Sequence, residues 1–241
     1  MGIPKIIHYC WFGGKEKPRD IKKYMESWKI LSDYKIIEWN ENNFDINSHE
    51  FIKEAYRMKK YAFVSDYVRL NVLKKYGGIY LDTDIEVKKD FSPLLDCELF
   101  LGFMYDSLLG TAVIGSKKNN LVISNLLKKY DSMNVEMVAN NNMYTKYFLD
   151  NFKDFKLNNK VQSLDGNIMI YPKEYFERPA FNKKIAFSEH HYTATWKDEG
   201  DKYIKKYIKN IIPNTIYRKI THKRALKYTP FYNIYLEHKN S

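Results

Sequence analysis

The chain has 241 residues, of which 44% are hydrophobic and 29% are charged, and its net charge is +11. These values predict one medium-sized α/β or α+β domain with room for a large buried core. The segment from Lys202 to Ser241 contains ten Lys or Arg residues and one acid, so it carries +9 of the +11. A basic protein favours anionic partners. The rest of the chain is almost neutral, which argues against a nucleic-acid groove across it.

The cysteine count and the length of the apolar runs indicate where in the cell the protein is expected. The two cysteines, Cys10 and Cys97, are too few for a disulfide framework and indicate free thiols in a reducing cytoplasm. The apolar run at the N-terminus is short and ends at Gly13 and Gly14, unlike a signal peptide. No apolar run approaches the ~18 residues of a membrane span. We therefore expect a cytoplasmic protein that contacts the inner face of the cell membrane at most peripherally.

Strands and helices are predicted to alternate over residues 1–200. In chain order, the expected elements are a strand at 3–12, a helix at 17–31, a strand at 34–39, two helices within 50–76, strands at 79–82, 99–104 and 111–115, helices at 120–130 and 143–152, and strands at 161–164 and 168–171. Gly77 is well placed to end the helix before it. This alternation predicts an open sheet with helices on its faces.

The stretch GGIYLDTDIEV at 77–87 places two carboxylates, Asp82 and Asp84, at the end of an apolar strand. In a strand they would share one face, about 6.5–7 Å apart, and would repel unless a cation or hydrogen-bond donors lie near them. Hard oxygen ligands suit Mg²⁺ or Mn²⁺. Ligands bind outside the carboxyl ends of strands in open α/β sheets. The pair is therefore either a metal site or a solvated strand end.

The preceding helix adds Asp66 and Arg69, three residues apart in its apolar half. Charged side chains in such surroundings are seldom left unpaired. They form either a structural ion pair or a pair that hydrogen-bonds a polyhydroxylated ligand above the strand end.

Three segments together resemble glycosyltransferase family 32, the DXD-containing group that includes capsular polysaccharide synthesis enzymes. They are also similar to the catalytic domains of the large clostridial glucosylating toxins. The segments are IPKIIHYCWFGG at the start, YAFVSDYVRLNVLKKYGGIYLDTDIEV in the middle and HHYTATW near residue 190, and IMIYPKEYFERP also fits the family's pattern. The resemblance implies a GT-A catalytic domain over residues 1–200, which is a Rossmann-like nucleotide-sugar-binding fold. It also implies a divalent cofactor, Mn²⁺ or Mg²⁺.

The resemblance gives the four charged residues roles. Asp82 would contact the donor sugar and ribose, and Asp84 would bind the metal that bridges the diphosphate. Asp66 and Arg69 would hold the sugar hydroxyls. A metal on the diphosphate neutralises charge that develops on the departing nucleoside diphosphate.

The first segment would bind the nucleotide. Trp11 matches the aromatic residue that stacks on the base, His8 would lie near the nucleotide, and the glycines beside Trp11, Gly13 first, would let the ligand approach the backbone. The alternatives are that Trp11 is an ordinary core residue and that His8 is a buried histidine with satisfied hydrogen bonds.

The HHYTATW segment would complete the site. One of its two adjacent histidines would face the metal, and we favour His191 over His190, because neighbours in an extended chain point to opposite sides. Thr195 and Trp196 would close over the diphosphate. The alternative is that both histidines are surface residues.

The acceptor side is less defined. Asn140, Asn141 and Asn142 either line it or form a polar loop, and Asp106 is a candidate sugar contact. No residue stands out as a covalent nucleophile. We therefore expect a same-face mechanism in which the donor phosphate helps to deprotonate the acceptor hydroxyl.

The basic tail over residues 201–241 is predicted to be helical. The apolar residues recur at helical spacing before Pro213, with lysines opposite: Ile204, Tyr207, Ile208, Ile211 and Ile212. Such an amphipathic helix either packs on the domain or lies on an anionic membrane surface, which would suit a lipid-linked acceptor.

These features predict a retaining, metal-dependent glycosyltransferase in bacterial surface polysaccharide synthesis, with a UDP-sugar as the favoured donor and a glycan or lipid-linked glycan as acceptor. One alternative is a phosphohydrolase of the haloacid dehalogenase type, but Ile85 and Glu86 follow Asp84 where that family has Gly-Thr. Another is a nucleic-acid-binding protein, which the confinement of charge to the tail disfavours.

Overall fold

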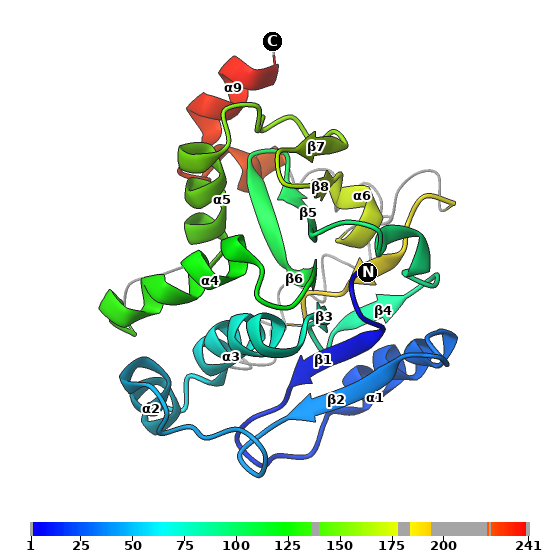
Figure 1. The fold of residues 1–241 in the computed structure, drawn as a ribbon, viewed down its shortest axis with the longest axis vertical. Helices are drawn as coiled ribbons and strands as arrows, with labels where there is room; N and C mark the ends of the chain where they lie inside the picture. The colour runs from blue at the N-terminus through cyan, green and yellow to red at the C-terminus, as the bar shows by residue number, and fades with distance from the viewer. Residues whose placement is uncertain (1, 136–139, 178–183, 194–220, 222, 240–241) are drawn as a thin grey trace.

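The computed structural model of this chain describes residues 2–135, 140–177, 184–193, 221 and 223–239. A seven-stranded sheet lies at its centre, in the order β2-β1-β3-β6-β5-β8-β7 (Figure 1). Its strands are β1 (Ile6–Cys10), β2 (Lys35–Trp39), β3 (Gly78–Leu81), β5 (Leu99–Tyr105), β6 (Leu108–Ser116), β7 (Gln162–Leu164) and β8 (Ile168–Tyr171). The pairs β1–β2, β1–β3 and β5–β8 are parallel, whereas β3–β6, β5–β6 and β7–β8 are antiparallel. The sheet is therefore mixed.

Helices cover both faces of this sheet. They are α1 (Arg19–Glu26), α2 (Glu50–Arg57), α3 (Tyr61–Tyr76), α4 (Leu121–Lys128), α5 (Asn140–Asn151), α6 (Lys173–Phe176) and α9 (Tyr232–Lys239), with 3-10 turns at Ser27–Ile30, Ser92–Leu94 and Lys129–Ser132. The expected α/β fold is confirmed. The helix predicted at 17–31 is shorter, because a 3-10 turn replaces its second half.

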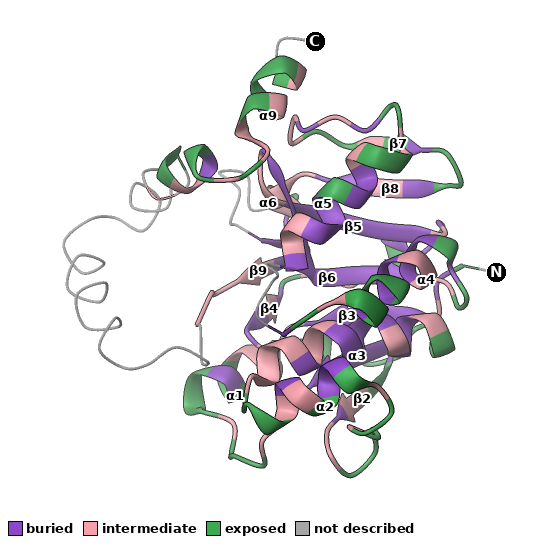
Figure 2. Cartoon of the chain, turned by 90° about the vertical axis from the view of Figure 1, so that its left-hand side faces the viewer, coloured by how far each residue is buried: buried purple, intermediate pink, exposed green. Residues whose placement is uncertain are grey.

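Alternation along the strands divides the core in two. Tyr80 of β3 packs with helices α2–α5 in one hydrophobic cluster, whereas its neighbours Ile79 and Leu81 pack in the other, with the 3-10 residue Trp28 and with Phe176 of α6. This is the two-residue period of a strand buried on both faces. In Figure 2 the central strands β3, β5 and β6 are almost entirely buried.

A tight junction joins α3 to β3. Gly77 ends α3 with φ +67°, and its N–H donates to the carbonyl of Leu73, so the predicted helix cap is confirmed. A side chain there would meet the backbone of Lys118 and Ser116, and its φ favours glycine. The strand therefore begins at once and places Asp82 directly after the carboxyl end of β3, where its N–H donates to the carbonyl of Ala112 in β6 at 2.9 Å.

A second, two-stranded sheet was not predicted. It pairs β4 (Ile85–Val87) antiparallel to β9 (Ser188–His190), with Ile85 opposite His190. The sheet places the segment around residue 190 directly against the DXD segment, about a hundred residues earlier in the chain. Three-residue strands carry too little periodicity to be identified from sequence.

The C-terminal region is described from Thr221 and Lys223 onward, so the predicted helix over 202–212 lies outside the described residues. Leu226 and Tyr235 belong to the first hydrophobic cluster, and the hydroxyls of Thr229 and Ser107 are 2.6 Å apart. This part of the tail packs on the domain. Among the described helices, none is both long and apolar enough to cross a membrane.

Candidate active site

Arg69 links the two acids that surround the end of β3. Its Nη2 lies 2.9 Å from Oδ1 of Asp66 and 3.2 Å from Oδ1 of Asp82, and its Nη1 donates to the carbonyl of Thr111 at 2.8 Å. The Tyr80 hydroxyl also donates to Oδ1 of Asp82, at 3.0 Å. One buried guanidinium therefore serves two carboxylates, which helix α3 and strand β3 bring together.

The charges in this group do not cancel, because two carboxylates share one cation. Burial raises the pKa of Asp82 to about 6, with Arg69 opposing the shift and the nearby charge of Asp84 adding to it. Burial also raises the pKa of Asp66. A second hydroxyl, that of Tyr144, is buried close to these charges and has no hydrogen-bond partner among the described residues.

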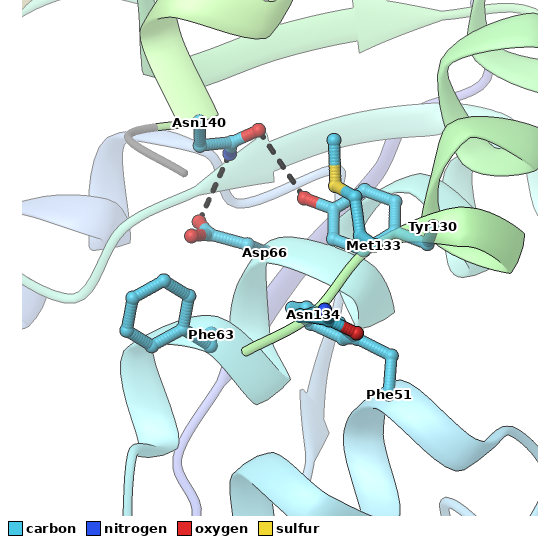
Figure 3. A pocket seen from close by; sticks show the side chains of 7 residues that line it. All are labelled: Phe51, Phe63, Asp66, Tyr130, Met133, Asn134 and Asn140. Atoms are coloured by element: carbon cyan, nitrogen blue, oxygen red, sulfur yellow. Dashed lines mark hydrogen bonds between the residues drawn. The ribbon is translucent and has the colours of Figure 1, made fainter. Parts of the chain in front are cut away.

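Asp66 also faces a small pocket (Figure 3). The side-chain amide of Asn140 donates to Oδ1 of Asp66 at 2.9 Å, and its oxygen accepts from the Tyr130 hydroxyl at 3.3 Å. The pocket is lined by Phe51, Phe63, Asp66, Tyr130, Met133, Asn134 and Asn140. The polar-loop interpretation of residues 140–142 is wrong, because these residues form the first turn of α5. Asn140 instead joins the Asp66 group.

Asp84 has a different set of partners. The backbone N–H and the hydroxyl of Thr193 donate to its Oδ2 at 2.8 and 3.0 Å, and Nε2 of His190 lies 3.2 Å from its Oδ1. Burial alone would raise the pKa of Asp84, but these donors outweigh it and hold the pKa well below its usual range. Asp84 is therefore the stably ionised member of the pair.

His190 lies between two carboxylates. Its Nδ1 is 2.7 Å from Oε2 of Glu177, and its Nε2 faces Asp84. Burial would lower the pKa of His190, but the charges of Glu177 and Asp84 outweigh this and raise it well above the usual value. The ring also stacks on Tyr192, with centroids 4.0 Å apart.

His191 points the other way. Its Nε2 is 2.8 Å from Oε2 of Glu86, and its ring stacks on Tyr24 with centroids 3.9 Å apart. The Lys88 ammonium already pairs with Glu86 on that side. The two histidines do diverge, as expected from an extended chain. The preference for His191 is corrected, because it is His190 that lies beside Asp84.

A divalent metal fits the group formed by Asp82, Asp84 and His190. One ligand atom from each of Asp82, Asp84 and His190 lies within 4.8 Å of the other two. Around an ion with ligands at about 2.1 Å, octahedral neighbours are about 3 Å apart and opposite ligands about 4.2 Å apart. Two carboxylates and an imidazole also match the ligand preferences of Mn²⁺. The side chains need only small shifts to share one ion.

His8 lies in the core. It is 0% exposed, its Nε2 lies 2.8 Å from the carbonyl of Gly77, and its Nδ1 accepts from the indole of Trp39 at 3.1 Å. These bonds require a neutral ring that donates through Nε2, and burial lowers its pKa accordingly. The expected nucleotide contact is corrected, because neither ring nitrogen is available to a ligand. The structure matches the buried-histidine alternative.

Trp11 and Gly13 follow β1. Trp11 is half-buried and belongs to neither hydrophobic cluster; its indole donates to the carbonyl of Lys15 at 2.6 Å, and the Lys17 ammonium lies 5.5 Å from the ring centroid. Gly13 has φ +94°, and a side chain there would collide with the ring of Tyr61. The ring of Tyr61 thus occupies the space beside the Gly13 backbone where we expected a ligand. Base stacking on Trp11 stays a prediction.

Several residues complete this account. Thr195 and Trp196 lie outside the described residues. Asp106 pairs with the Lys173 ammonium, which gives it a structural partner. Sequence reasoning missed Tyr80, Glu177 and Thr193. Tyr80 could have been found, because it shares a strand face with Asp82. Thr193 gave no local signal, since its partner Asp84 is 109 residues earlier in the chain. Glu177 gave none either, because its partners His190 and Tyr192, 13 and 15 residues later, show no periodic pattern with it.

The chain is similar to known glycosyltransferases. Residues 18–101 match the family described as glycosyltransferase sugar-binding region containing DXD motif. An uncharacterized glycosyltransferase of Acanthamoeba polyphaga mimivirus is 31% identical over 182 residues, which cover 67% of this chain and 69% of that protein. The mannosyl phosphorylinositol ceramide synthase SUR1 of Saccharomyces cerevisiae is 32% identical over 112 residues, covering 41% of this chain and only 27% of the yeast protein.

Among solved structures, PaToxG glycosyltransferase superposes with a TM-score of 0.50 and 22% identity, over 62% of this chain and 69% of that one. This likeness concerns the fold, which is the GT-A fold predicted from the sequence. The family match contains Asp66, Arg69, Asp82 and Asp84, the four charged residues that meet at the end of β3. The chain belongs to the family of glycosyltransferases whose sugar-binding region contains a DXD motif.

Proposed function

We propose that this glycosyltransferase moves a sugar from a nucleotide-sugar donor to a hydroxyl of a glycan or lipid-linked glycan, with a divalent metal and with retention of configuration. One observation carries the proposal. Asp82, Asp84 and His190 lie close enough to share one ion, next to the Arg69 guanidinium, which contacts Asp82 and one further carboxylate, that of Asp66. A family whose motif contributes two of these ligands makes a metal-bound diphosphate the simplest occupant.

Each group has a separate task in this proposal. Asp84 and His190 hold Mn²⁺ or Mg²⁺, which when bound neutralises charge on the departing nucleoside diphosphate. Asp82 faces both the ion and the sugar. Arg69 orients Asp82 and Asp66 through Oδ1 of each, so Oδ2 of each can accept a hydrogen bond from a sugar hydroxyl. Because all these groups are fixed by the fold, little reorganisation is needed when the donor binds.

The nucleotide would lie toward Trp11, where a partly exposed indole offers a stacking surface. A UDP-sugar is the favoured donor. GDP-sugars also belong in a test, and mannose donors among them, because a similar yeast protein is a mannosyl phosphorylinositol ceramide synthase. A lipid-linked acceptor of bacterial surface polysaccharide synthesis, held near the inner face of the membrane by the basic tail, completes the proposal.

In this proposal no protein side chain attacks the sugar. The acceptor hydroxyl attacks it directly, and the donor phosphate assists deprotonation of that hydroxyl. Asp82, the carboxylate closest to the expected sugar, is held by Arg69 and Tyr80. Those bonds reduce its nucleophilicity. A same-face reaction is therefore favoured over a covalent glycosyl-enzyme.

The test is a donor screen. The protein is incubated with Mn²⁺ and a panel of UDP- and GDP-sugars, and free nucleoside diphosphate is measured. We expect slow donor hydrolysis with one donor, and a loss of at least about 100-fold in Asp84→Ala, the size of effect typical for removal of one charge-stabilising group.

The matched control is Asp150→Ala. Asp150 is an exposed acid of α5 that pairs with Lys146, so its removal changes the charge without touching the site. Full turnover in Asp84→Ala would overturn the proposal, as would the lack of turnover and of binding with every donor by folded protein.

A further inference from the structure

We propose that Glu177 is a positioning residue that fixes the ring of His190, so that Nε2 of His190 presents its lone pair to the metal beside Asp84. This inference rests on the metal-dependent function proposed above. It assigns a task to a buried acid that lies outside the DXD motif, at the C-terminal end of α6.

Glu177 is buried and its partners are specific. Its side chain is 3% exposed, and its Oε2 lies 2.7 Å from Nδ1 of His190 and accepts from the Tyr192 hydroxyl at 2.8 Å. Among the described residues, no lysine or arginine forms an ion pair with it. A carboxylate is costly to bury without a partner. The ring of His190 therefore provides the partner that compensates the burial of Glu177, which couples the positions of the two side chains.

The backbone reinforces the same contact. The carbonyl of Glu177 accepts from the backbone N–H of His190 at 3.3 Å, and its own N–H donates to the carbonyl of Lys173 at 2.8 Å. On the opposite side, Gly110 of β6 leaves space that a side chain would take from the Glu177 carboxylate. The Glu177 carboxylate, at the end of α6, is thus enclosed between β6 and β9.

Glu177 also holds the turn that follows His190. Tyr192 has φ +51°, a left-handed conformation that non-glycine residues rarely adopt. Its hydroxyl bond to Glu177 and its stacking on His190 secure that conformation. The turn is what directs the N–H and hydroxyl of Thr193 at Asp84. One carboxylate therefore orients both groups that contact Asp84.

A carboxylate bound to one ring nitrogen of a histidine prepares the other nitrogen to bind a metal. A carboxylate that accepts from Nδ1–H fixes the tautomer, holds the ring plane and makes Nε2 a stronger donor to a metal. In this structure Nε2 lies 3.2 Å from Oδ1 of Asp84, and a metal bound between them would take the place of the proton on Nε2.

The experiment measures Mn²⁺ affinity alone, by electron paramagnetic resonance of free Mn²⁺. Removal of the carboxylate that holds a metal-ligating histidine weakens metal binding by about 10–100-fold. We expect a loss of Mn²⁺ affinity of this size in Glu177→Ala. Glu177→Gln keeps the shape but offers a neutral, weaker acceptor, so we expect a loss of roughly 3- to 10-fold. The control is Glu174→Gln, which removes a charge from the same helix as Glu177, where the Lys173 ammonium lies 3.0 Å away, at a residue outside the Asp82, Asp84 and His190 group. Its affinity should stay within about 3-fold of wild type.

A second readout is independent of affinity. In the Co²⁺-loaded protein, the proton on Nδ1 of His190 should give a shifted, slowly exchanging NMR signal that Glu177→Gln keeps and Glu177→Ala loses. Wild-type affinity in Glu177→Gln, or an equal loss in Glu174→Gln, would overturn the inference alone. No Mn²⁺ binding by wild type would overturn the metal-dependent function as well, so the two failures are distinguishable.

Discussion

Asp82 and Asp84 are the same residue type, two positions apart, yet the regions around them differ in almost every respect. The Asp82 region is built from α3 and β3, and two acids there share the cation Arg69. The Asp84 region is built from β4 and β9, and Asp84 has the donors of Thr193 and a ring nitrogen of His190 to itself. As a result, the pKa of Asp82 is raised to about 6 and that of Asp84 is lowered.

The difference shows that a short motif fixes the positions of two carboxylates but not their electrostatics. The region built from neighbouring segments is short of positive charge, and the region completed by a distant strand is rich in donors. For a metal-dependent transferase this division is useful, because the ionised acid can hold the ion while the other faces the sugar.

The largest expected effect concerns the shared cation. Arg69→Ala leaves Asp66 and Asp82 without their cation, and we expect a loss of about 3–5 kcal/mol in the free energy of unfolding, measured by urea denaturation. Arg57→Ala is the control, since it breaks an exposed pair with Glu54 and should leave stability almost unchanged. Similar losses in both variants would mean that Arg69 is only a surface-type partner.

Paired variants of Asp84 and Asp82 should differ in stability in metal-free protein at pH 7. Asp84→Asn removes the acceptor of charge-assisted hydrogen bonds, so we expect a loss of about 2–3 kcal/mol. Asp82→Asn relieves a repulsion, so the change should not exceed about 1 kcal/mol in either direction. Equal losses in the two variants would show that the two regions are electrostatically alike.

The pH dependence sharpens the same contrast. A carboxyl group whose folded-state pKa is raised favours folding while it is protonated, and this contribution is lost as the pH rises from about 3.8 to about 6. Across that range, metal-free wild type should lose about 1–2 kcal/mol relative to Asp82→Asn, allowing for solvent at the partly exposed carboxylate. Denaturation at several pH values measures the difference. A constant difference would contradict the raised pKa of Asp82.

The smallest effect concerns the hydroxyls near Asp82. Tyr80→Phe removes a bond to Asp82 and should cost about 1 kcal/mol, whereas Tyr144→Phe removes a hydroxyl without a described partner and should be neutral or stabilising by up to about 1 kcal/mol. Thermal and urea unfolding measure both. Destabilisation by Tyr144→Phe would mean that its hydroxyl has a partner such as a buried water.

Most of the large elements could be predicted from sequence, because long apolar patterns report a strand or helix directly. The helix 61–76, its end at Gly77 and the strand that follows are examples. The misassigned segments are short or polar. The three asparagines at 140–142 look like a loop because asparagine is a poor helix former, but Asn140 bonds to Asp66 and begins α5.

By itself, the sequence determined that two carboxylates end a buried strand and that a helix carrying Asp66 and Arg69 precedes them. These residues lie within twenty positions of one another, on a helix and on the strand that directly follows it, so the sequence could indicate that they lie close together. Only the tertiary structure decided that His190 faces Asp84, that Glu177 lies behind His190, and that His8 is buried. The contacts of His8 with Gly77 and of His190 with Asp84 join residues about seventy and more than a hundred positions apart. Glu177 is only 13 residues from His190, but their contact depends on where β9 lies against β4, and which side of a short strand faces the site depends on its register with a partner.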